Sequence, residues 1–149
     1  YEMTVSLGKE LARCGFIVAC GGLFGVMEAV CQGVKNEGGF TIGILPGLNK
    51  NDANPYVDLK IPTGMGEARN NIVVSIADGV IIVAGESGTL SEIAIAWRLK
   101  KPIIALTSSG GWAERLTQKK IDATRTDMIL GADSPENAVK MMLKLLKTS

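Results

Sequence analysis

The feature that most constrains the fold is a repeated alternation of short apolar runs with longer segments of helical spacing, separated by glycine-rich turns. The run at residues 79–84 is apolar on both faces, as a central strand of a parallel sheet should be. Such alternation is typical of an α/β fold, a doubly wound parallel sheet with helices on both faces. Apolar runs occupy residues 16–20, 41–45, 57–61, 79–84, 102–106 and 128–130, and helical spacing covers 3–14, 25–36, 67–77, 89–99, 112–119 and 134–147.

The length of 149 residues, with 46% hydrophobic residues, suits one ordinary domain with a real core. We find no internal repeat and no linker, so a single domain over residues 1–149 is expected. The sequence opens inside a helical pattern without an initiator methionine. We therefore expect a strand and loop upstream of this sequence, and any binding groups on them are not visible in it.

Composition excludes several function classes. The chain has no histidine, which removes Ser-His-Asp and Cys-His catalysis and histidine-ligated zinc. The formal net charge is +1, which argues against nucleic acid or an anionic membrane as partner. No apolar run approaches the roughly 20 residues of a membrane span. Three cysteines among apolar neighbours, without a C-x-x-C pattern, indicate buried free thiols in a reducing cytoplasm. The polar residues Asp52, Asn54 and Asp58 match no calcium loop and are interpreted as a solvated turn.

In a doubly wound sheet, ligands bind beyond the carboxyl ends of the strands, and this rule selects residues 21–25, 46–55, 85–89 and 108–111. At 85–89, the amides of Ser87, Gly88 and Thr89 would point outward at a helix N-terminus, where a phosphate is favoured. The alternative is an ordinary tight turn with Thr89 as N-cap. The glycines Gly21, Gly22 and Gly25 could form a second anion-binding turn, or could only allow close packing of helix on strand.

Four further side chains are candidates for function. Arg69 lies at a helix start, where its charge opposes the helix dipole and a bound phosphate would explain it; the alternative is a surface arginine paired with Glu67 or solvent. Glu92 stands three residues after Thr89, either as part of a capping box or aimed at a ligand. Trp112 is the candidate for stacking on a base. Trp97 is expected in the core or at a subunit contact, on the helix 89–99 that is our candidate interface of a homo-oligomer.

Together these segments resemble the LONELY GUY superfamily, whose members are also labelled lysine decarboxylases, and especially its small single-domain branch of molybdenum cofactor carrier-like and DprA/Smf-related proteins. Residues 20–28 resemble its G-G-G-x-x-G-L-M-G motif, with Cys20 and Glu28 as departures. Residues 84–92 resemble its P-G-G-x-G-T-x-x-E motif, and residues 66–70 are a degraded M-x-x-R-K motif. The resemblance covers residues 16–106 and implies a Rossmann-like fold.

The enzymes of that superfamily cleave nucleoside 5′-monophosphates into base and ribose 5-phosphate. The resemblance implies that Arg69 would clamp the substrate and that Glu92 would contact the ribose or the attacking water. It also implies a phosphate site made by Gly21, Gly22, Gly25, Gly85, Ser87, Gly88 and Thr89.

Three departures favour binding over catalysis. Glu86 replaces a glycine of the phosphate turn, and a carboxylate about 5 Å from a phosphate charge is opposed by roughly 3 kcal/mol at an effective dielectric constant near 20. Asn70 replaces a lysine, and the motif methionine is offset to Met65. Pyridoxal-dependent lysine decarboxylation is excluded, because it needs a Schiff-base lysine in a much larger chain.

The first interpretation is therefore a cytosolic carrier or sensor of a phosphorylated small molecule, a nucleotide or a molybdopterin-type cofactor, with no cofactor required for folding or activity. The alternative is a phosphoribohydrolase acting through Arg69 and Glu92. A DprA/Smf-like DNA-binding module is the third interpretation, disfavoured because the chain lacks a basic stretch with aromatic residues.

Overall fold

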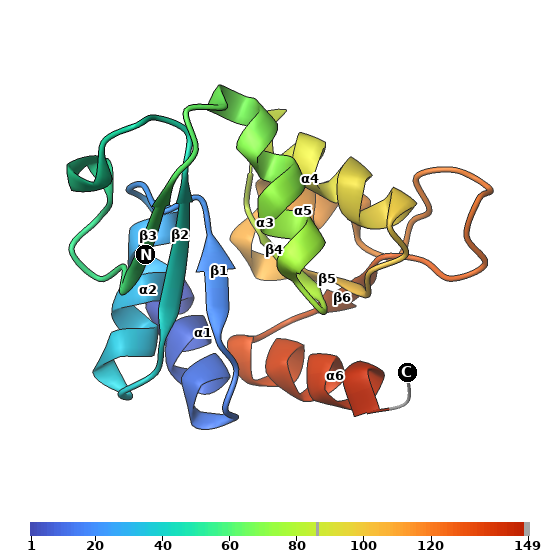
Figure 1. The fold of residues 1–149 in the computed structure, drawn as a ribbon. Helices are drawn as coiled ribbons and strands as arrows, with labels where there is room; N and C mark the ends of the chain where they lie inside the picture. The colour runs from blue at the N-terminus through green and yellow to red at the C-terminus, as the bar shows by residue number, and fades with distance from the viewer. Residues whose placement is uncertain (86, 148–149) are drawn as a thin grey trace. The chain divides into compact units, whose positions relative to one another are not determined.

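A computed structural model describes residues 1–85 and 87–147 (Figure 1). The chain forms two compact units, Tyr1–Val73 and Val74–Ser149, and each is described by itself. A single domain over residues 1–149 therefore stays a prediction. In the two described ranges, no helix has the length and apolar character needed to cross a bilayer.

The first unit contains a parallel sheet with the strand order β1–β2–β3. The register pairs Val18 with Thr41 and Ile42 with Leu59. Parallel strands need crossover connections, and helix α2 supplies the one between β1 and β2. The elements of this unit are α1 (Glu2–Arg13), β1 (Val18–Cys20), α2 (Val26–Asn36), β2 (Thr41–Leu45), η1 (Lys50–Asp52), β3 (Leu59–Pro62) and η2 (Gly66–Arg69).

Two glycines let α1 and α2 pack against each other at unusually close range. A methyl group added at Gly33 would overlap the carbonyl oxygen of Val5, and one added at Gly8 would overlap that of Val30. Both obstacles are backbone atoms, which cannot rotate away. Glycine within these helices, although unfavourable for helix formation, is therefore required by their packing.

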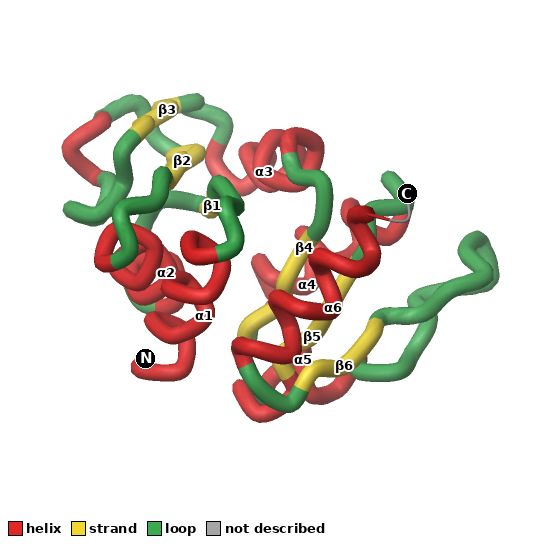
Figure 2. Tube along the Cα trace, turned by 90° about the horizontal axis from the view of Figure 1, so that it is seen from below, coloured by secondary structure: helices red, strands yellow, loops and turns green. Residues whose placement is uncertain are grey.

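The second unit contains another parallel sheet, with the order β4–β5–β6 (Figure 2). Helix α3 leads into it from the first unit. Both sheets confirm the parallel α/β pattern expected from the sequence. The elements are α3 (Asn70–Ile76), β4 (Val80–Val83), α4 (Ser87–Arg98), β5 (Ile103–Leu106), η3 (Thr107–Ser109), α5 (Gly111–Leu116), β6 (Leu130–Ala132) and α6 (Pro135–Lys147).

Helices cover both faces of the second sheet. Ile103 and Ala105 of β5 belong to one buried cluster with residues of α4 and α5. Successive side chains of a strand point to opposite faces, so Ile104 and Leu106, both fully buried, point the other way. Helix α6 contacts β5 and β6 and accounts for the burial of that opposite face.

Several element boundaries differ from the sequence-based expectations. Helix α4 begins at Ser87, so Thr89 lies inside its first turn and the expected capping box of Thr89 with Glu92 is wrong. The expected helix 67–77 is divided into η2 and α3, because its first turn closes through a 3-10 hydrogen bond from Ala68 to Met65. In the last strand, Ile129 instead forms an antiparallel bridge with Lys119, which shifts the parallel strand to Leu130–Ala132.

The apolar run 79–84 was also expected to be a central strand, yet in its sheet β5 holds the central position and β4 pairs, within the described ranges, with β5 alone. β5 is buried along its whole length. A strand that is apolar on both faces indicates that both faces of the sheet are covered. It does not indicate whether the strand pairs with one neighbouring strand or with two.

Candidate anion-binding site

A glycine turn joins β1 to α2 in the first unit. Gly22 and Gly25 adopt φ values of 76° and 71°, which favour glycine. A methyl group on Gly22 would lie 2.8 Å from Leu45 Cδ2 and 3.1 Å from Gly43 Cα. Gly25 is the N-cap of α2 and offers no side chain to its first amides. The turn therefore packs on the end of β2 and leaves the positive end of an 11-residue helix without a side-chain cap.

Arg69 lies directly beneath this turn. Its side chain is buried, with 5% exposure, and Nη1 donates hydrogen bonds to the carbonyl oxygens of Gly21 at 2.6 Å and Ile44 at 2.7 Å. A methyl group on Gly21 would be 2.5 Å from Nη1. The alternative of a surface arginine paired with Glu67 or solvent is therefore wrong, because the side chain inserts between the ends of β1 and β2.

The charge of Arg69 has no carboxylate partner among the described residues, and its Nε is buried with no hydrogen-bond partner in them. A guanidinium stays protonated at every physiological pH, and an isolated buried charge is costly. Together with the end of α2, it gives the glycine turn a positive character. This arrangement can attract an anion such as a phosphate.

Asn54 is the residue of this site that sequence reasoning misplaced. It is fully buried, which makes the expectation of a solvated turn wrong at this position. Its backbone N–H donates to Gly22 O at 2.9 Å, its Nδ2 donates to Leu23 O at 2.6 Å, and its Oδ1 accepts from Tyr56 N at 3.0 Å. Because Asn54 donates hydrogen bonds to carbonyl oxygens of the turn, it fixes the orientation of the peptide groups there. Its place in the loop after β2, at a strand end, is the signal that could have identified it.

A second glycine turn follows β4 in the other unit. Ala84 and Gly85 have φ values of 51° and 107°, and Ser109 Oγ accepts a hydrogen bond from Ala84 N at 2.7 Å. Gly111 approaches the same turn so closely that a methyl group there would be 2.9 Å from Gly85 O. The start of α5 therefore braces this turn.

The first residues of α4 are Ser87, Gly88 and Thr89. Their backbone N–H groups lie in the first turn, where such groups have no hydrogen-bond partner within the helix. The Thr89 side chain faces Gly85, because a methyl group on Gly85 would lie 2.5 Å from Thr89 Cγ2. Glu92 is half-buried in the following turn of the helix. Glu86, whose carboxylate was expected to oppose a phosphate, lies outside the described residues.

The structure thus brings Gly21, Gly22, Gly25 and Arg69 together in the first unit, and Gly85, Ser87, Gly88, Thr89 and Glu92 into one turn and helix of the second. A joint site made by both turns stays a prediction.

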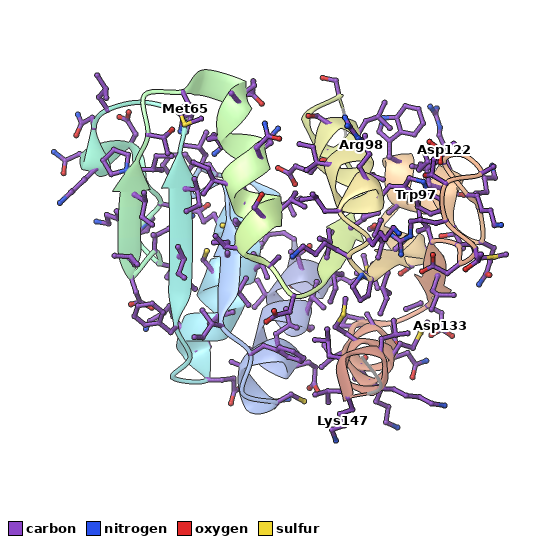
Figure 3. The ribbon with its side chains drawn as sticks, turned by 45° about the vertical axis from the view of Figure 1, so that its right-hand side comes forward. Met65, Trp97, Arg98, Asp122, Asp133 and Lys147 are labelled. Atoms are coloured by element: carbon purple, nitrogen blue, oxygen red, sulfur yellow. The ribbon has the colours of Figure 1, made fainter. Side chains whose placement is uncertain are left out.

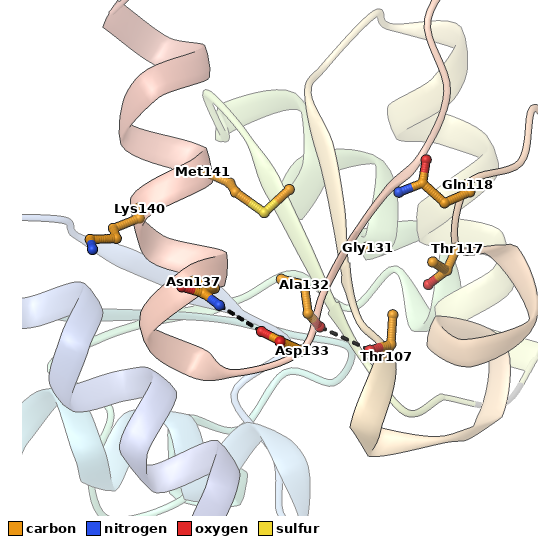
Figure 4. Close-up of a pocket in the computed structure, with 9 residues that line it drawn as sticks. All are labelled: Thr107, Thr117, Gln118, Gly131, Ala132, Asp133, Asn137, Lys140 and Met141. Atoms are coloured by element: carbon orange, nitrogen blue, oxygen red, sulfur yellow. Dashed lines mark hydrogen bonds between the residues drawn. The ribbon is translucent and has the colours of Figure 1, made fainter.

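A cavity of about 510 Å³ lies in the second unit, where β5 and β6 end (Figure 4). Two hydrogen bonds join residues of its lining, from Thr107 Oγ1 to Ala132 O at 3.1 Å and from Asn137 Nδ2 to Asp133 Oδ1 at 2.6 Å. Lys140 is the cation of its lining and Asp133 the anion. The cavity was not expected from the sequence, and neither glycine turn contributes to it. It is lined by Thr107, Thr117, Gln118, Gly131, Ala132, Asp133, Asn137, Lys140 and Met141.

Each of the two tryptophans has an arginine guanidinium over its ring. Trp97 is 1% exposed and donates from Nε1 to Asp122 Oδ1 at 2.9 Å (Figure 3). It lies under Arg125, whose Cζ is 4.6 Å from the ring centroid. Of the two expectations for Trp97, the core is confirmed, because the buried cluster of its own unit encloses the side chain. The helix 89–99 as an interface of a homo-oligomer stays a prediction. Arg115 stacks on Trp112 with its Cζ 5.3 Å from the centroid, which occupies one face of the base-stacking candidate. In the part of the chain that the structure describes, no cluster of cysteine and carboxylate side chains could hold a metal ion.

The sequence and the fold are similar to those of known proteins. The model of the SLOG cluster4 family matches residues 1–139. The chain belongs to the SLOG cluster4 family. Among solved structures it is similar to the molybdenum cofactor binding protein of Rippkaea orientalis, with 36% identity, a TM-score of 0.85 and coverage of 97% of this chain and 86% of that one. The molybdenum cofactor carrier protein of Chlamydomonas reinhardtii has 32% identity and a TM-score of 0.82, over 99% and 88% of the two chains. These likenesses establish the Rossmann-like α/β fold.

Similarity also extends to LOG-type enzymes. A probable cytokinin riboside 5′-monophosphate phosphoribohydrolase of rice is 34% identical over 101 residues, and the enzyme of that name from Mycobacterium tuberculosis is 30% identical over 99. Each alignment covers 64% of this chain and about half of the enzyme, 44% and 53% respectively. A DNA processing protein A of Helicobacter pylori, 20% identical with a TM-score of 0.61, shares the fold. The resemblance expected from the sequence motifs is thus confirmed.

Proposed function

We propose that this protein binds a phosphorylated small molecule of the molybdopterin-cofactor class and acts as its carrier. The observation that carries the proposal is the similarity, over nearly the whole chain, to molybdenum cofactor carrier and binding proteins. In this proposal the cofactor is cargo, and the protein needs none of its own. A nucleotide is the second ligand class that the same chemistry would accept.

The geometry of the first unit supports an anionic ligand. The N-terminus of α2 has no side-chain cap, and beneath it Arg69 carries a buried charge that no described carboxylate neutralises. A phosphate at the turn would meet free N–H groups, the helix dipole and this charge together. In the second unit, we propose the same role for the amides of Ser87, Gly88 and Thr89.

Binding and the role of Arg69 can be tested together. We expect the protein to bind molybdopterin cofactor, measured by calorimetry and by mass spectrometry of the intact complex. Arg69→Gln should weaken binding by more than tenfold, whereas Arg69→Lys, which keeps the charge, should lose less. Lys9→Gln on α1 is the charge-matched control and should bind like the native protein. An Arg69→Gln protein that keeps its circular dichroism spectrum and its native affinity would refute an anion site at this turn.

The alternative is a phosphoribohydrolase, favoured by the presence of both Arg69 and Glu92 and by the identity with the two LOG-type enzymes. It predicts release of ribose 5-phosphate from a nucleoside 5′-monophosphate. That turnover should disappear in Glu92→Gln and persist in the control Glu136→Gln on α6. Such turnover would overturn the carrier proposal, and tight binding without turnover would overturn the enzyme.

We further propose a homo-oligomer that works in the cytoplasm without nucleic acid or membrane. Large apolar side chains are exposed on the single chain, among them Ile17 at 64%, Phe24 at 57% and Leu48 at 82%. Burial of such side chains between copies would contribute to association. Static light scattering that gives the mass of one chain at micromolar concentration would refute the oligomer.

A further inference from the structure

Two cysteine thiols lie against each other beneath the glycine turn of the first unit. Cys20 is the last residue of β1, Cys31 lies in α2, and their Sγ atoms are 3.6 Å apart. A disulfide bond is about 2.05 Å long, so the two sulfurs would have to approach by about 1.5 Å to join. The third cysteine, Cys14, is exposed at the end of α1, so the expectation of a buried thiol is wrong at this position. Proximity therefore singles out one pair.

The two thiols differ in their surroundings. Cys31 is fully buried, and its hydrogen bond with Cys20, followed by burial, holds the pKa of the Cys31 thiol far above its ordinary value. Cys20 is half-buried, and its Sγ accepts a hydrogen bond from Gly22 N at 3.3 Å. An N–H donor favours negative charge on the sulfur that accepts from it. Cys20 is thus the thiol that can ionise and meet an oxidant, and Cys31 is the thiol that can resolve the product.

We propose that Cys20 and Cys31 are a redox modification site, which a hydroperoxide converts into a reversible disulfide that regulates the glycine turn. The Cys20 thiolate attacks one peroxide oxygen, the O–O bond breaks, and hydroxide leaves to give a sulfenic acid. The Cys31 sulfur then attacks the Cys20 sulfur. The S–O bond breaks, and the hydroxyl group leaves as water with the Cys31 proton. Overall, two thiols and hydrogen peroxide give one disulfide and two waters.

The disulfide would act on the proposed ligand site, and to that extent the inference rests on the proposed function. Cys20 immediately precedes Gly21, and its sulfur is the acceptor of the Gly22 amide. A disulfide would draw Cys20 toward α2 and so move the sulfur away from the Gly22 amide. It would also shift the turn, which Asn54 holds by hydrogen bonds to Leu23 O and Gly22 O. We therefore expect the oxidised protein to bind a phosphate ligand more weakly. By linkage, a bound ligand makes the disulfide harder to form by the same factor.

The disulfide itself is tested on the whole protein by a thiol count. After treatment with hydrogen peroxide and alkylation under denaturing conditions, we expect the number of alkylated cysteines to fall from three to one, with a peptide that links Cys20 to Cys31. Cys14→Ser, the matched control, should still form the link and retain no alkylated cysteine. In Cys31→Ser, Cys20 should accumulate as sulfenic acid. A link that involves Cys14, or a pair still reduced when Cys14 is oxidised, would overturn the proposal.

The effect on the turn is measured by amide hydrogen exchange and by calorimetry with AMP as the probe. We expect altered exchange over residues 21–31 and a loss of AMP affinity of roughly 5- to 150-fold, the usual range of coupling between two sites. Dithiothreitol should reverse both. Unchanged exchange and affinity in the disulfide form would refute the regulation. If exchange changes but neither form binds AMP or molybdopterin cofactor, the redox pair stands and the proposed function fails.

Discussion

Removing the side chain of Asn54 should unfold the first unit locally around its glycine turn. This amide is fully buried and makes three hydrogen bonds, from Nδ2 to Leu23 O and to Gly22 O, and from Tyr56 N to Oδ1. Asn54→Ala deletes all three and leaves Leu23 O and Tyr56 N, both in half-buried residues, without these partners. Each such group costs about 1–3 kcal/mol, so we expect a loss of about 2–6 kcal/mol in the free energy of unfolding.

Asn54→Asp is a sharper version of the same experiment, because it keeps the shape of the side chain. One carboxylate oxygen can still accept from Tyr56 N, but the other would face Leu23 O, where a donor is required. A carboxylate that is removed from water and faces a carbonyl oxygen is disfavoured, so we expect folding to raise the pKa of the introduced carboxyl group. Its protonated form can donate to Leu23 O. The variant should therefore be most stable below the carboxyl pKa of the unfolded chain, near pH 4, and lose stability as pH rises through the folded value.

Urea unfolding followed by circular dichroism between pH 4 and pH 8 measures both effects. We expect Asn54→Ala to be destabilised to a similar extent across this range and Asn54→Asp to worsen with rising pH. Asn51→Asp, on the exposed 3-10 turn of the same loop, is the matched control and should be close to native at every pH. Native stability of Asn54→Asp at pH 8 would refute the assignment of Nδ2 as a required donor to the turn.

Three other substitutions test the packing and electrostatics of the fold. Gly33→Ala should lose about 1–3 kcal/mol in urea unfolding, since its methyl group overlaps a carbonyl oxygen of α1. Gly47→Ala is the control and should be neutral, since its methyl group would meet only Asp52 Oδ2, at an ordinary contact distance of 3.5 Å. For Asp58, burial raises the pKa, but hydrogen bonds from a β2 amide and an α2 lysine outweigh it and lower the value overall. Asp58 should thus stabilise the fold above the ordinary carboxyl pKa and lose this effect as pH falls through the lowered value, and Asp58→Asn should abolish that pH dependence in thermal melts. Trp97→Phe should lose about 1–3 kcal/mol through lost packing and the missing bond to Asp122, without changing the mass measured by light scattering.

Much of the fold could be predicted from the sequence because hydrophobic periodicity reports burial directly. The strand 41–45 was expected at its observed bounds, and the helices that begin near Val26 and Pro135 were found within about a residue. The turns that follow β1 and β4 were predicted from their glycines, because glycine is the residue that readily adopts the backbone conformations of tight turns. The order of strands within a sheet was not predicted, since apolar faces carry no information on neighbours.

The supporting residues of the candidate site were harder to see. Asn54 and Arg69 are polar residues in polar, glycine-rich segments, and such residues are exposed in most proteins. Their side chains are held by hydrogen bonds to Gly21, Leu23 and Ile44, which lie 25 or more positions away in the sequence. Likewise, Cys20 and Cys31 are each apolar in context, and their pairing appears only once the turn brings α2 back over β1.

The hydrogen bonds of Arg69 also help to decide between the carrier and the phosphoribohydrolase interpretations. The enzyme interpretation implies that this guanidinium clamps a substrate, yet its Nη1 is already committed to the carbonyl oxygens of Gly21 and Ile44. A residue bound in this way acts on a ligand through its charge and through the turn that it holds in place, and both effects are present before a ligand arrives. Such an arrangement stabilises a bound anion in its ground state as much as in a transition state. Uniform binding of this kind suits a carrier, whereas an enzyme gains rate only from contacts that strengthen as the bond breaks.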